Sequence, residues 1–172
     1  YKVASKNNWR IPEYYDEEWQ PRLEAGKLCN DGRRYHEGYV TGHSMQLARF
    51  ALQVRAGLRS TGWAVPDYLM ELGTELFERA RVDGWRRTDG APGFSTAVND
   101  QGNPVPGEDE HQQGGVCEGV CATVAVRRAM LDDGHRIDEV EHFEHCDRTF
   151  LEYHHDYLNA QPGRWLRRLG PH

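Results

Sequence analysis

The sequence contains little cysteine, and its few thiols follow no recognised spacing. Four cysteines occur in 172 residues: Cys29, Cys117, Cys121 and Cys146. Their positions match neither a disulfide framework nor a zinc ribbon, which excludes a small domain built on either. Because unpaired cysteines are typical of a reducing compartment, we expect a cytoplasmic location.

Long apolar runs and an excess of positive charge are also absent. No stretch approaches the roughly 20 apolar residues of a membrane-spanning helix, and no secretory leader is visible. The chain carries 21 Lys and Arg against 27 Asp and Glu, for a formal net charge of −6, and its basic residues are scattered. A nucleic-acid-binding surface normally concentrates basic residues. We therefore expect neither a membrane nor a nucleic acid among the partners.

Aromatic residues are plentiful in an otherwise polar chain. Five Trp, eight Tyr and five Phe accompany a hydrophobic fraction of only 38%, and the mean hydropathy is −0.83. This aromatic content argues against disorder, and the length suits one domain with a core. We predict a single domain over residues 1–172, with a mostly irregular lead-in over residues 1–38.

The most informative stretch is Tyr39–Leu58. It predicts a polar turn followed by an amphipathic helix, capped by the hydroxyl of Ser44 or Thr41. His43 would lie at the helix entrance, where the helix dipole lowers the pKa of an imidazole and favours the neutral ring that acts as a base. The pattern alone favours a simpler interpretation, in which His43 caps the helix or packs. The apolar residues with helical spacing, expected in the core, are Leu47, Phe50, Ala51, Val54 and Leu58.

Three further helices are predicted from apolar periodicity. The second begins with Pro66, whose missing N–H costs nothing at that position, and ends near Gly84. Its apolar stripe comprises Leu69, Leu72, Leu76, Phe77 and Ala80. The third spans Gly115–Leu131, and its expected buried face comprises Val116, Cys117, Val120, Cys121, Val124 and Leu131. The fourth spans Ile137–Leu158.

The segments between these helices complete the expected plan. Residues 93–105 combine β-prone residues with turn residues and predict a small β-hairpin or extended excursion. Cys117 and Cys121 lie one helical turn apart; packing as small hydrophobic groups is favoured over a metal site or a disulfide. Helical pairs joined by loops indicate an all-α fold in which paired helices stack around an axis.

Short motifs follow one another over nearly the whole chain. They are Pro12–Trp19, the turn and helix Gly42–Arg49, Ala80–Trp85, the segment from Gly93-Phe94 to Gly102-Asn103-Pro104-Val105, and Gly163–Leu169. In this order they resemble the C-terminal half of the N-acylglucosamine 2-epimerases, cellobiose 2-epimerases and mannose isomerases. The Gly-Phe and Gly-Asn-Pro-Val segment is more similar to the mannose isomerase branch than to the N-acylglucosamine branch.

The resemblance implies an (α/α)6 toroid, a barrel of six helical hairpins, of which this chain would form a part. It implies an isomerase or epimerase that moves a proton at C2 of a mannose-like aldose through an enediolate. Histidine would be the general acid and base, with no metal and no other cofactor. The expected partner is then a small-molecule sugar. Because the family's N-terminal half and second catalytic histidine have no counterpart here, we expect a homo-oligomer or the remainder of the barrel on another segment.

The resemblance also gives roles to four residues. His43 is the counterpart of a catalytic histidine, and Gln46, Arg49 and Glu118 correspond to the substrate pocket or its wall. The family usually has glutamate where Gln46 stands. An amide can hydrogen-bond a sugar hydroxyl, but it cannot raise the pKa of a neighbouring imidazole by charge. We therefore expect His43 to be catalytic and the other three to bind substrate.

Two other interpretations of the sequence stay open. One is a metal site in the last predicted helix, formed by His142, His145, Cys146, His154 and His155. Acidic residues interleave with them and no known ligand spacing is matched, so solvated, charge-paired histidines are favoured. The other is a non-catalytic helical module that binds carbohydrate or protein, its activity lost through truncation and substituted pocket residues.

Overall fold

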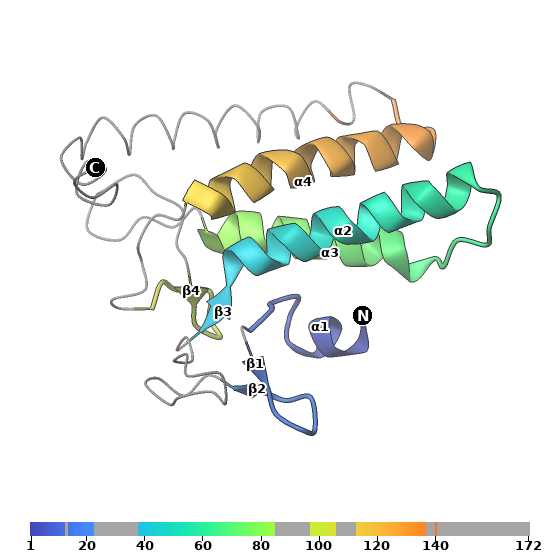
Figure 1. Ribbon diagram of the computed structural model, residues 1–172. Coiled ribbons are helices and arrows are strands. Elements are labelled where there is room, and N and C mark those ends of the chain that lie inside the picture. The colour runs from blue at the N-terminus through green and yellow to red at the C-terminus, as the bar shows by residue number, and fades with distance from the viewer. Residues whose placement is uncertain (13, 23–37, 85–96, 106–112, 137–139, 141–172) are drawn as a thin grey trace, which may run out of the picture.

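Three long helices packed side by side form the body of the computed structural model (Figure 1). The structure describes residues 1–12, 14–22, 38–84, 97–105, 113–136 and 140. Its elements are α1 (Lys2–Lys6), β1 (Tyr14–Tyr15), β2 (Pro21–Arg22), β3 (Tyr39–Val40), α2 (Thr41–Ser60), α3 (Tyr68–Gly84), β4 (Ala97–Val98) and α4 (Gln113–Asp132). The mostly helical character that the sequence predicts is confirmed. The fourth predicted helix lies, apart from Val140, outside the described residues.

The core lies where α2 contacts α3 and α4. The predicted apolar stripe of α3 is confirmed, because all five of its side chains are buried. The buried apolar residues of the other two helices are mostly small: Met45, Ala48, Ala51 and Leu52 on α2, and Ala122, Val126 and Ala129 on α4. Small side chains let helix axes approach closely. The helices α2 and α3 lie close together at Gly73 of α3, where an added Cβ would lie 2.5 Å from the Cγ of Leu52.

The predicted core face of α2 is confirmed only in part, because Leu47 and Leu58 are partly buried and pack against the core. Phe50 is 61% exposed and Val54 is 36% exposed, whereas Ala51 alone of the five predicted residues is buried. The helix contacts neighbours on two sides, and the arc that faces them also carries Ser44 and Arg55. The buried arc of α2 therefore mixes Met45 and Leu52 with small and polar residues, and a search for large apolar side chains passes over the latter.

The predicted core face of α4 is likewise confirmed only in part, because Val120 is partly buried and packs against the core. Val124 is 55% exposed and Leu131 is 38% exposed, and Cys117 and Cys121 are exposed instead of packed. Thr123 occupies a buried position because its Oγ1 hydroxyl donates a hydrogen bond to the Gly119 carbonyl at 2.9 Å, which removes the penalty of burying it. The packed surface of α4 is thus rotated away from its cysteines.

Two helices begin at residues other than those predicted. α2 begins at Thr41, with no turn before it, and Val40 is its extended N-cap residue, with no hydrogen bond from a capping side chain. The expected caps, Thr41 and Ser44, both lie inside the helix. α3 begins at Tyr68, and Pro66 precedes it, its carbonyl accepting a hydrogen bond from a first-turn amide. The start of α2 is therefore fixed by the strand before it.

Two small antiparallel sheets flank the helices (Figure 1). β1 pairs with β2, inside the segment 1–38 that was expected to be mostly irregular. β3 pairs with β4, with Val40 opposite Ala97. After β4 the chain reverses, and the Asn99 amide donates to the Asn103 carbonyl at 2.8 Å. Residues 93–96 of the predicted hairpin lie outside the described residues, and β4 pairs with the strand that leads into α2.

The end of α4 is tied back to α2 by charge. The predicted stop is confirmed, because α4 ends at Asp132 and Gly134 follows with φ +88°. Between them, Asp133 accepts hydrogen bonds from Arg55 Nη2 at 2.6 Å and from Arg59 Nη1 at 2.7 Å. The hydrogen bond and the positive charge of Arg55 hold the pKa of Asp133 below its ordinary value.

Two glycine substitutions should change stability in opposite directions. In Gly73→Ala the new Cβ would meet the buried Leu52, so we expect the free energy of unfolding to fall by about 1–2 kcal/mol. In Gly57→Ala the Cβ meets nothing within 4 Å, so we expect a gain of about 0.5–1 kcal/mol from helix propensity. Urea unfolding followed by circular dichroism measures both. A gain from both variants would contradict the tight contact between α2 and α3.

Asp133→Asn should destabilise the fold in a pH-dependent way. We expect a loss of about 1 kcal/mol at neutral pH, typical of a partly exposed charged hydrogen bond. A depressed folded-state pKa stabilises the protein above the unfolded-state pKa of about 4, and this stabilisation is lost as pH falls through the folded-state pKa. The difference from wild type should therefore shrink below about pH 4.

The matched control for this prediction is Asp132→Asn. Asp132 pairs within its own helix with the exposed Arg128 at 2.9 Å, a contact worth only about 0.3–0.5 kcal/mol. Equal losses in the two variants, or a constant effect of Asp133→Asn from pH 7 to acid pH, would show that Asp133 does not tie the helices together.

Candidate functional site

The predicted catalytic residue, His43, lies in the first turn of α2. Its neighbours Thr41, Gly42 and Ser44 are buried, whereas His43 is exposed. The Ser44 hydroxyl donates to the Val40 carbonyl at 3.4 Å, which joins the helix to the strand before it. The first turn of α2 therefore packs against the rest of the protein through Thr41, Gly42 and Ser44, and the His43 side chain lies on its exposed side.

Gln46 lies one turn after His43 on the same exposed stripe of α2. Residues three and four apart share a helix face, and His43, Gln46 and Phe50 are all exposed. Arg49 lies on the flank nearest α4 and is partly buried. Since a helix rises about 1.5 Å per residue, Arg49 lies about 9 Å along the axis from His43. Three of the four predicted site residues therefore occupy two turns of one helix.

Arg49 and Glu118 form an ion pair between α2 and α4. Arg49 Nε lies 2.9 Å from Glu118 Oε2, and Nη2 donates to Oε1 at 3.2 Å. The two side chains are 30% and 27% exposed, so solvent screens the pair only in part. Only the Nη2 contact is a hydrogen bond, whereas Nε and Oε2 are close without the alignment of one. Nη1 of Arg49 takes no part in the contact with Glu118.

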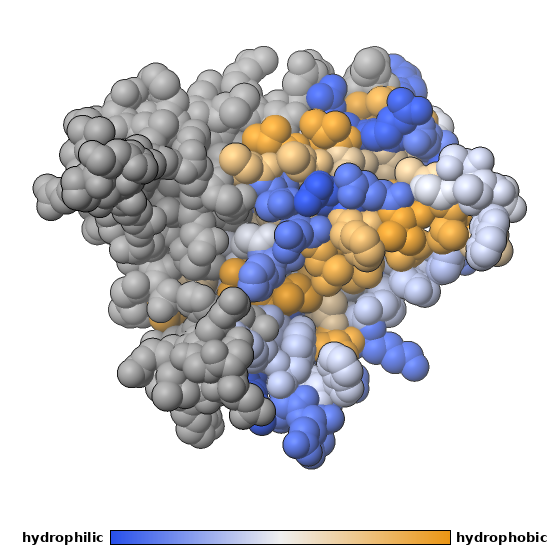
Figure 2. Space-filling model, viewed as in Figure 1, coloured by the Kyte–Doolittle hydropathy of each residue, from blue (hydrophilic) through white to orange (hydrophobic). Residues whose placement is uncertain are grey.

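The exposed side of α2 and α4 combines polar and apolar groups. Figure 2 shows apolar surface over both helices with a hydrophilic strip between the two bands. Phe50 contributes from α2, and Cys117, Cys121 and Val124 follow one another along the exposed side of α4. This surface, bridged by Arg49 and Glu118, offers hydrogen-bonding groups beside apolar contact area.

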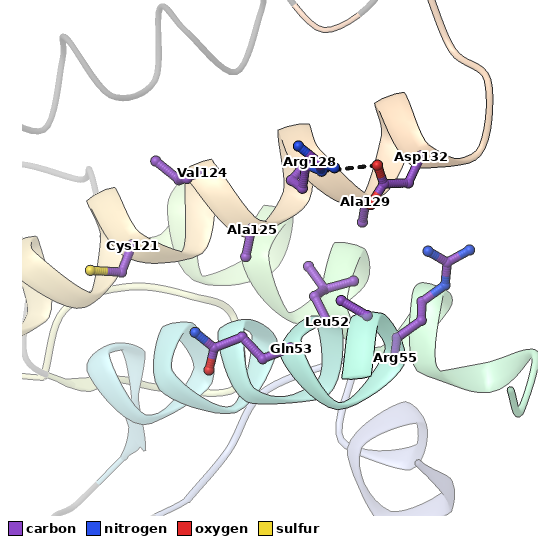
Figure 3. A pocket seen from close by; sticks show the side chains of 10 residues that line it. Leu52, Gln53, Arg55, Cys121, Val124, Ala125, Arg128, Ala129 and Asp132 are labelled. Atoms are coloured by element: carbon purple, nitrogen blue, oxygen red, sulfur yellow. Dashed lines mark ion pairs between the residues drawn. The ribbon is translucent and has the colours of Figure 1, made fainter. Parts of the chain in front are cut away.

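A groove of about 210 Å³ lies between α2 and α4 (Figure 3). Its lining residues are Leu52, Gln53, Arg55, Ala56, Cys121, Val124, Ala125, Arg128, Ala129 and Asp132. It contains none of the four predicted site residues. It is also smaller than the roughly 300–1,000 Å³ of most ligand pockets. The groove is therefore distinct from the predicted site.

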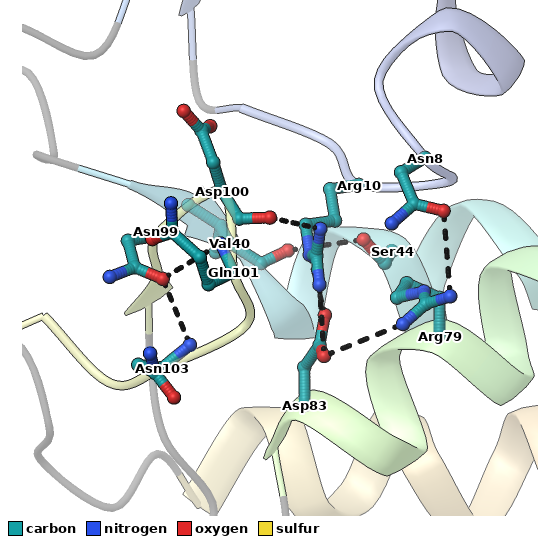
Figure 4. A network of polar contacts seen from close by, with 10 residues as sticks. All are labelled: Asn8, Arg10, Val40, Ser44, Arg79, Asp83, Asn99, Asp100, Gln101 and Asn103. Atoms are coloured by element: carbon teal, nitrogen blue, oxygen red, sulfur yellow. Dashed lines mark hydrogen bonds and ion pairs between the residues drawn. The ribbon is translucent and has the colours of Figure 1, made fainter.

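The sequence did not reveal a buried charge network beside the start of α2 (Figure 4). Arg10 Nε lies 2.7 Å from Asp83 Oδ2, and these side chains are 5% and 1% exposed. Arg10 Nη2 donates to Asp83 Oδ1 at 3.2 Å, and Nη1 donates to the Asp100 carbonyl at 2.7 Å. Arg79 Nη1 lies 3.9 Å from Asp83 Oδ1. The only sequence signal was the place of Asp83 in the Ala80–Trp85 motif, which says nothing about Arg10.

Tyr39 belongs to the same neighbourhood. Burial, together with a hydrogen bond to the Asp100 side chain, raises the pKa of Tyr39 to about 12. Its phenol therefore stays protonated at physiological pH and acts as a donor.

Neither a metal centre nor a membrane span is found in the part of the chain that the structure describes. No group of three His, Cys, Asp or Glu side chains is placed there to hold a metal ion. The residues of the metal-site alternative, at positions 142, 145, 146, 154 and 155, lie outside the described ranges. Among the described helices, none combines the length and the apolar character needed to cross a bilayer.

Comparison with known proteins identifies relatives over nearly the whole chain. The family model described as N-acylglucosamine 2-epimerase (GlcNAc 2-epimerase) matches residues 1–172. A D-mannose isomerase of Pseudomonas cannabina pv. alisalensis is 29% identical over 171 residues, which are 98% of this chain and 38% of that protein. A D-mannose isomerase of Thermobifida fusca is 27% identical over 176 residues, covering 99% of this chain and 39% of that protein.

A solved structure shares the fold. The crystal structure of a D-mannose isomerase superposes with a TM-score of 0.66 at 19% identity, covering 88% of this chain and 34% of that one. At this identity the likeness concerns the fold alone. The chain spans about two fifths of the length of the curated relatives it matches.

The contact between Arg49 and Glu118 can be measured by a double-mutant cycle. Comparing Arg49→Met, Glu118→Gln and the double variant by urea unfolding should give a coupling energy of about 0.5–1 kcal/mol. The pair Arg81 and Glu78, one turn apart on α3 with contacts at 2.7 and 2.9 Å, is the control and should give about 0.3–0.5 kcal/mol. A coupling near zero for the first pair would remove the bridge between α2 and α4.

Proposed function

Since the chain belongs to the N-acylglucosamine 2-epimerase family, we propose that it carries part of the active site of a sugar isomerase or epimerase acting at C2 of an uncharged, mannose-like aldose. The observation that supports this most is the exposure of His43 in the first turn of α2, with Gln46 one turn further on the same face. The pair Arg49 and Glu118 adjoins them on the side of α4.

His43 is the general base and acid of the proposed reaction. The neutral imidazole takes the proton from C2 of the open-chain aldose, and the electron pair moves into an enediolate. Returning the proton to C1 gives the ketose, and returning a proton to the opposite face of C2 gives the epimer. An imidazole suits both directions because it titrates near neutral pH.

Gln46 and Arg49 bind the oxygens of the proposed substrate. The amide of Gln46 can donate to one hydroxyl and accept from another. The enediolate carries negative charge on its oxygens, and a guanidinium that is already oriented stabilises such charge without reorganising. Glu118 supports this orientation, because its carboxylate accepts a hydrogen bond from Nη2 and lies within 2.9 Å of Nε of Arg49. No cofactor takes part in the proposal.

The charges of these residues favour a neutral sugar over a sugar phosphate. Arg49 is the cation nearest Gln46 along α2, and its charge is compensated by Glu118. Gln46 adds no charge where the resemblance leads one to expect glutamate. A phosphate would call for cations that are free to pair with it. The pair therefore suits hydroxyl and carbonyl oxygens.

The described helices are proposed to form part of an (α/α)6 barrel, with residues 1–172 as a single domain. The chain covers 38% and 39% of the two mannose isomerases that it matches. The remainder of the barrel, on another segment or in a second copy, supplies the second acid and base of the site. An epimerase needs such a group on the opposite side of the sugar, because the proton leaves one face of C2 and returns to the other.

Hydrogen exchange tests the role of His43. Incubation with mannose or fructose in deuterated water should place deuterium on the carbon from which the proton is removed, followed by NMR of the recovered sugar. In His43→Gln we expect exchange to fall by about 10²–10⁴-fold, the usual contribution of a general acid or base.

The matched control is His135→Gln, the same change at an exposed position beyond the far end of α4. It should leave exchange unchanged. Equal exchange in His43→Gln and wild type would contradict the assignment of His43. No exchange by the wild-type chain at high protein concentration, with sugar binding retained, would favour the non-catalytic binding module instead.

A further inference from the structure

We propose that the buried Arg10–Asp83 ion pair is a positioning device for the start of α2 and so fixes the direction in which His43 is presented. This inference rests on the proposed role of His43. Neither Arg10 nor Asp83 contacts the exposed side of α2, since both side chains are buried. They act through the strand from which the helix begins.

The first step is the convergence of three segments on one guanidinium. Arg10 comes from the N-terminal segment, Asp83 from the last turn of α3, and the Asp100 carbonyl from the turn after β4. Arg10 reaches Asp83 with Nε and Nη2 and reaches Asp100 with Nη1. A planar fork with fixed donor directions therefore sets the relative placement of all three segments.

The second step leads from Arg10 to β3. The carbonyl of Ile11 accepts a hydrogen bond from the Val40 amide at 2.8 Å, and Pro12 forms a bridge with Tyr39. On its other edge β3 pairs with β4, whose following turn is the one that Arg10 holds. Both edges of β3 are thus connected to the ion pair within a few residues.

The third step leads from β3 to the imidazole. Val40 is the N-cap residue of α2, so no loop absorbs a change in the direction of the strand. Arg10, Asp83, Thr41 and Ser44 line one narrow void that is too small for a water molecule. Because no free space separates them, a movement of the ion pair is expected to move the first turn of α2 as well.

Gly102 provides an independent indication that this contact is tightly fitted. A Cβ at Gly102 would lie 2.3 Å from Asp83 Oδ1 and 2.7 Å from Arg10 Nη2, and the residue has φ +78°. Gly62 has a similar φ of +71°, with nothing within 4 Å of its Cβ position. The chain therefore contains a matched pair of glycines, of which one touches the ion pair.

A role in geometry explains the pair better than a role in stability. Desolvating two charges costs about as much as their attraction returns, so an apolar pair of similar volume is often equally stable. An apolar pair makes no directional hydrogen bonds, and it would leave the Asp100 carbonyl without the donor that Arg10 provides. We therefore expect weakening of the ion pair to alter His43 even when the protein stays folded.

The test compares Gly102→Ala with Gly62→Ala. Both variants place alanine in the left-handed backbone region and should lose a similar amount of stability for that reason. Only Gly102→Ala also displaces Asp83 and Arg10. In ¹⁵N-labelled protein the ring signals of His43, identified by their loss in His43→Gln, should shift or broaden in Gly102→Ala and stay as in wild type in Gly62→Ala.

Asp83→Asn should change the His43 ring signals in the same way, and Glu78→Gln on the same helix is its control. If Asp83→Asn does not fold, Arg10→Lys replaces it.

Exchange kinetics provide the second readout. If the wild-type chain exchanges the C2 proton, Gly102→Ala should lower kcat by about 10- to 100-fold with little change in KM, as expected when a reacting group is misplaced by a fraction of an ångström. Absence of exchange by wild type would count against the proposed function, whereas the NMR comparison would still decide the positioning role. Unchanged His43 ring signals in folded Gly102→Ala and in the folded ion-pair variant would overturn it.

Discussion

The guanidinium of Arg10 is the constraint on which the arrangement around α2 depends. It lies in a region without solvent and uses three donor nitrogens on Asp83 and on the Asp100 carbonyl. Removing either partner would leave a buried charge without its closest counter-charge, which is far more costly than replacing the pair as a whole. The N-terminal segment, the end of α3 and the turn after β4 are therefore fixed relative to one another. The strand that begins α2 lies between two of them.

Ion pairs between helices also connect segments on the exposed side of the molecule, where they are less buried. Arg49 and Glu118 connect α2 to α4 across a partly shielded gap, and Asp133 connects the end of α4 back to Arg55 and Arg59 of α2. These contacts lie nearer to water, so each contributes less to stability than its geometry suggests. They fix the rotation of α4 about its own axis, with Glu118 in contact with α2 and with Cys117 and Cys121 exposed.

Periodicity predicted the buried face of α3 correctly and the buried faces of α2 and α4 only in part, and the difference has a physical cause. α3 concentrates Leu69, Leu72, Leu76 and Phe77 on one face, and all are buried. On α2 and α4 the core positions are shared between Met45, Leu52 and Val126 and smaller residues, which are alanines and Thr123. Close packing selects small residues there, so the large apolar Phe50 and Val124 are left outside. A pattern search that weights side chains by size and hydropathy therefore chooses part of the face wrongly wherever helices approach closely.

Resemblance and periodicity gave different kinds of information about the candidate site. The motif order located His43, Gln46, Arg49 and Glu118 by residue type, which does not require the burial of their helices to be known. The structure then brought Arg49 and Glu118 within 2.9 Å, although 69 residues separate them. The Arg10–Asp83 pair has no such signal, because 73 residues separate two common residue types and a buried ion pair imposes no pattern on the sequence around it. Contacts that position a site from a distance are therefore those that only the folded structure reveals.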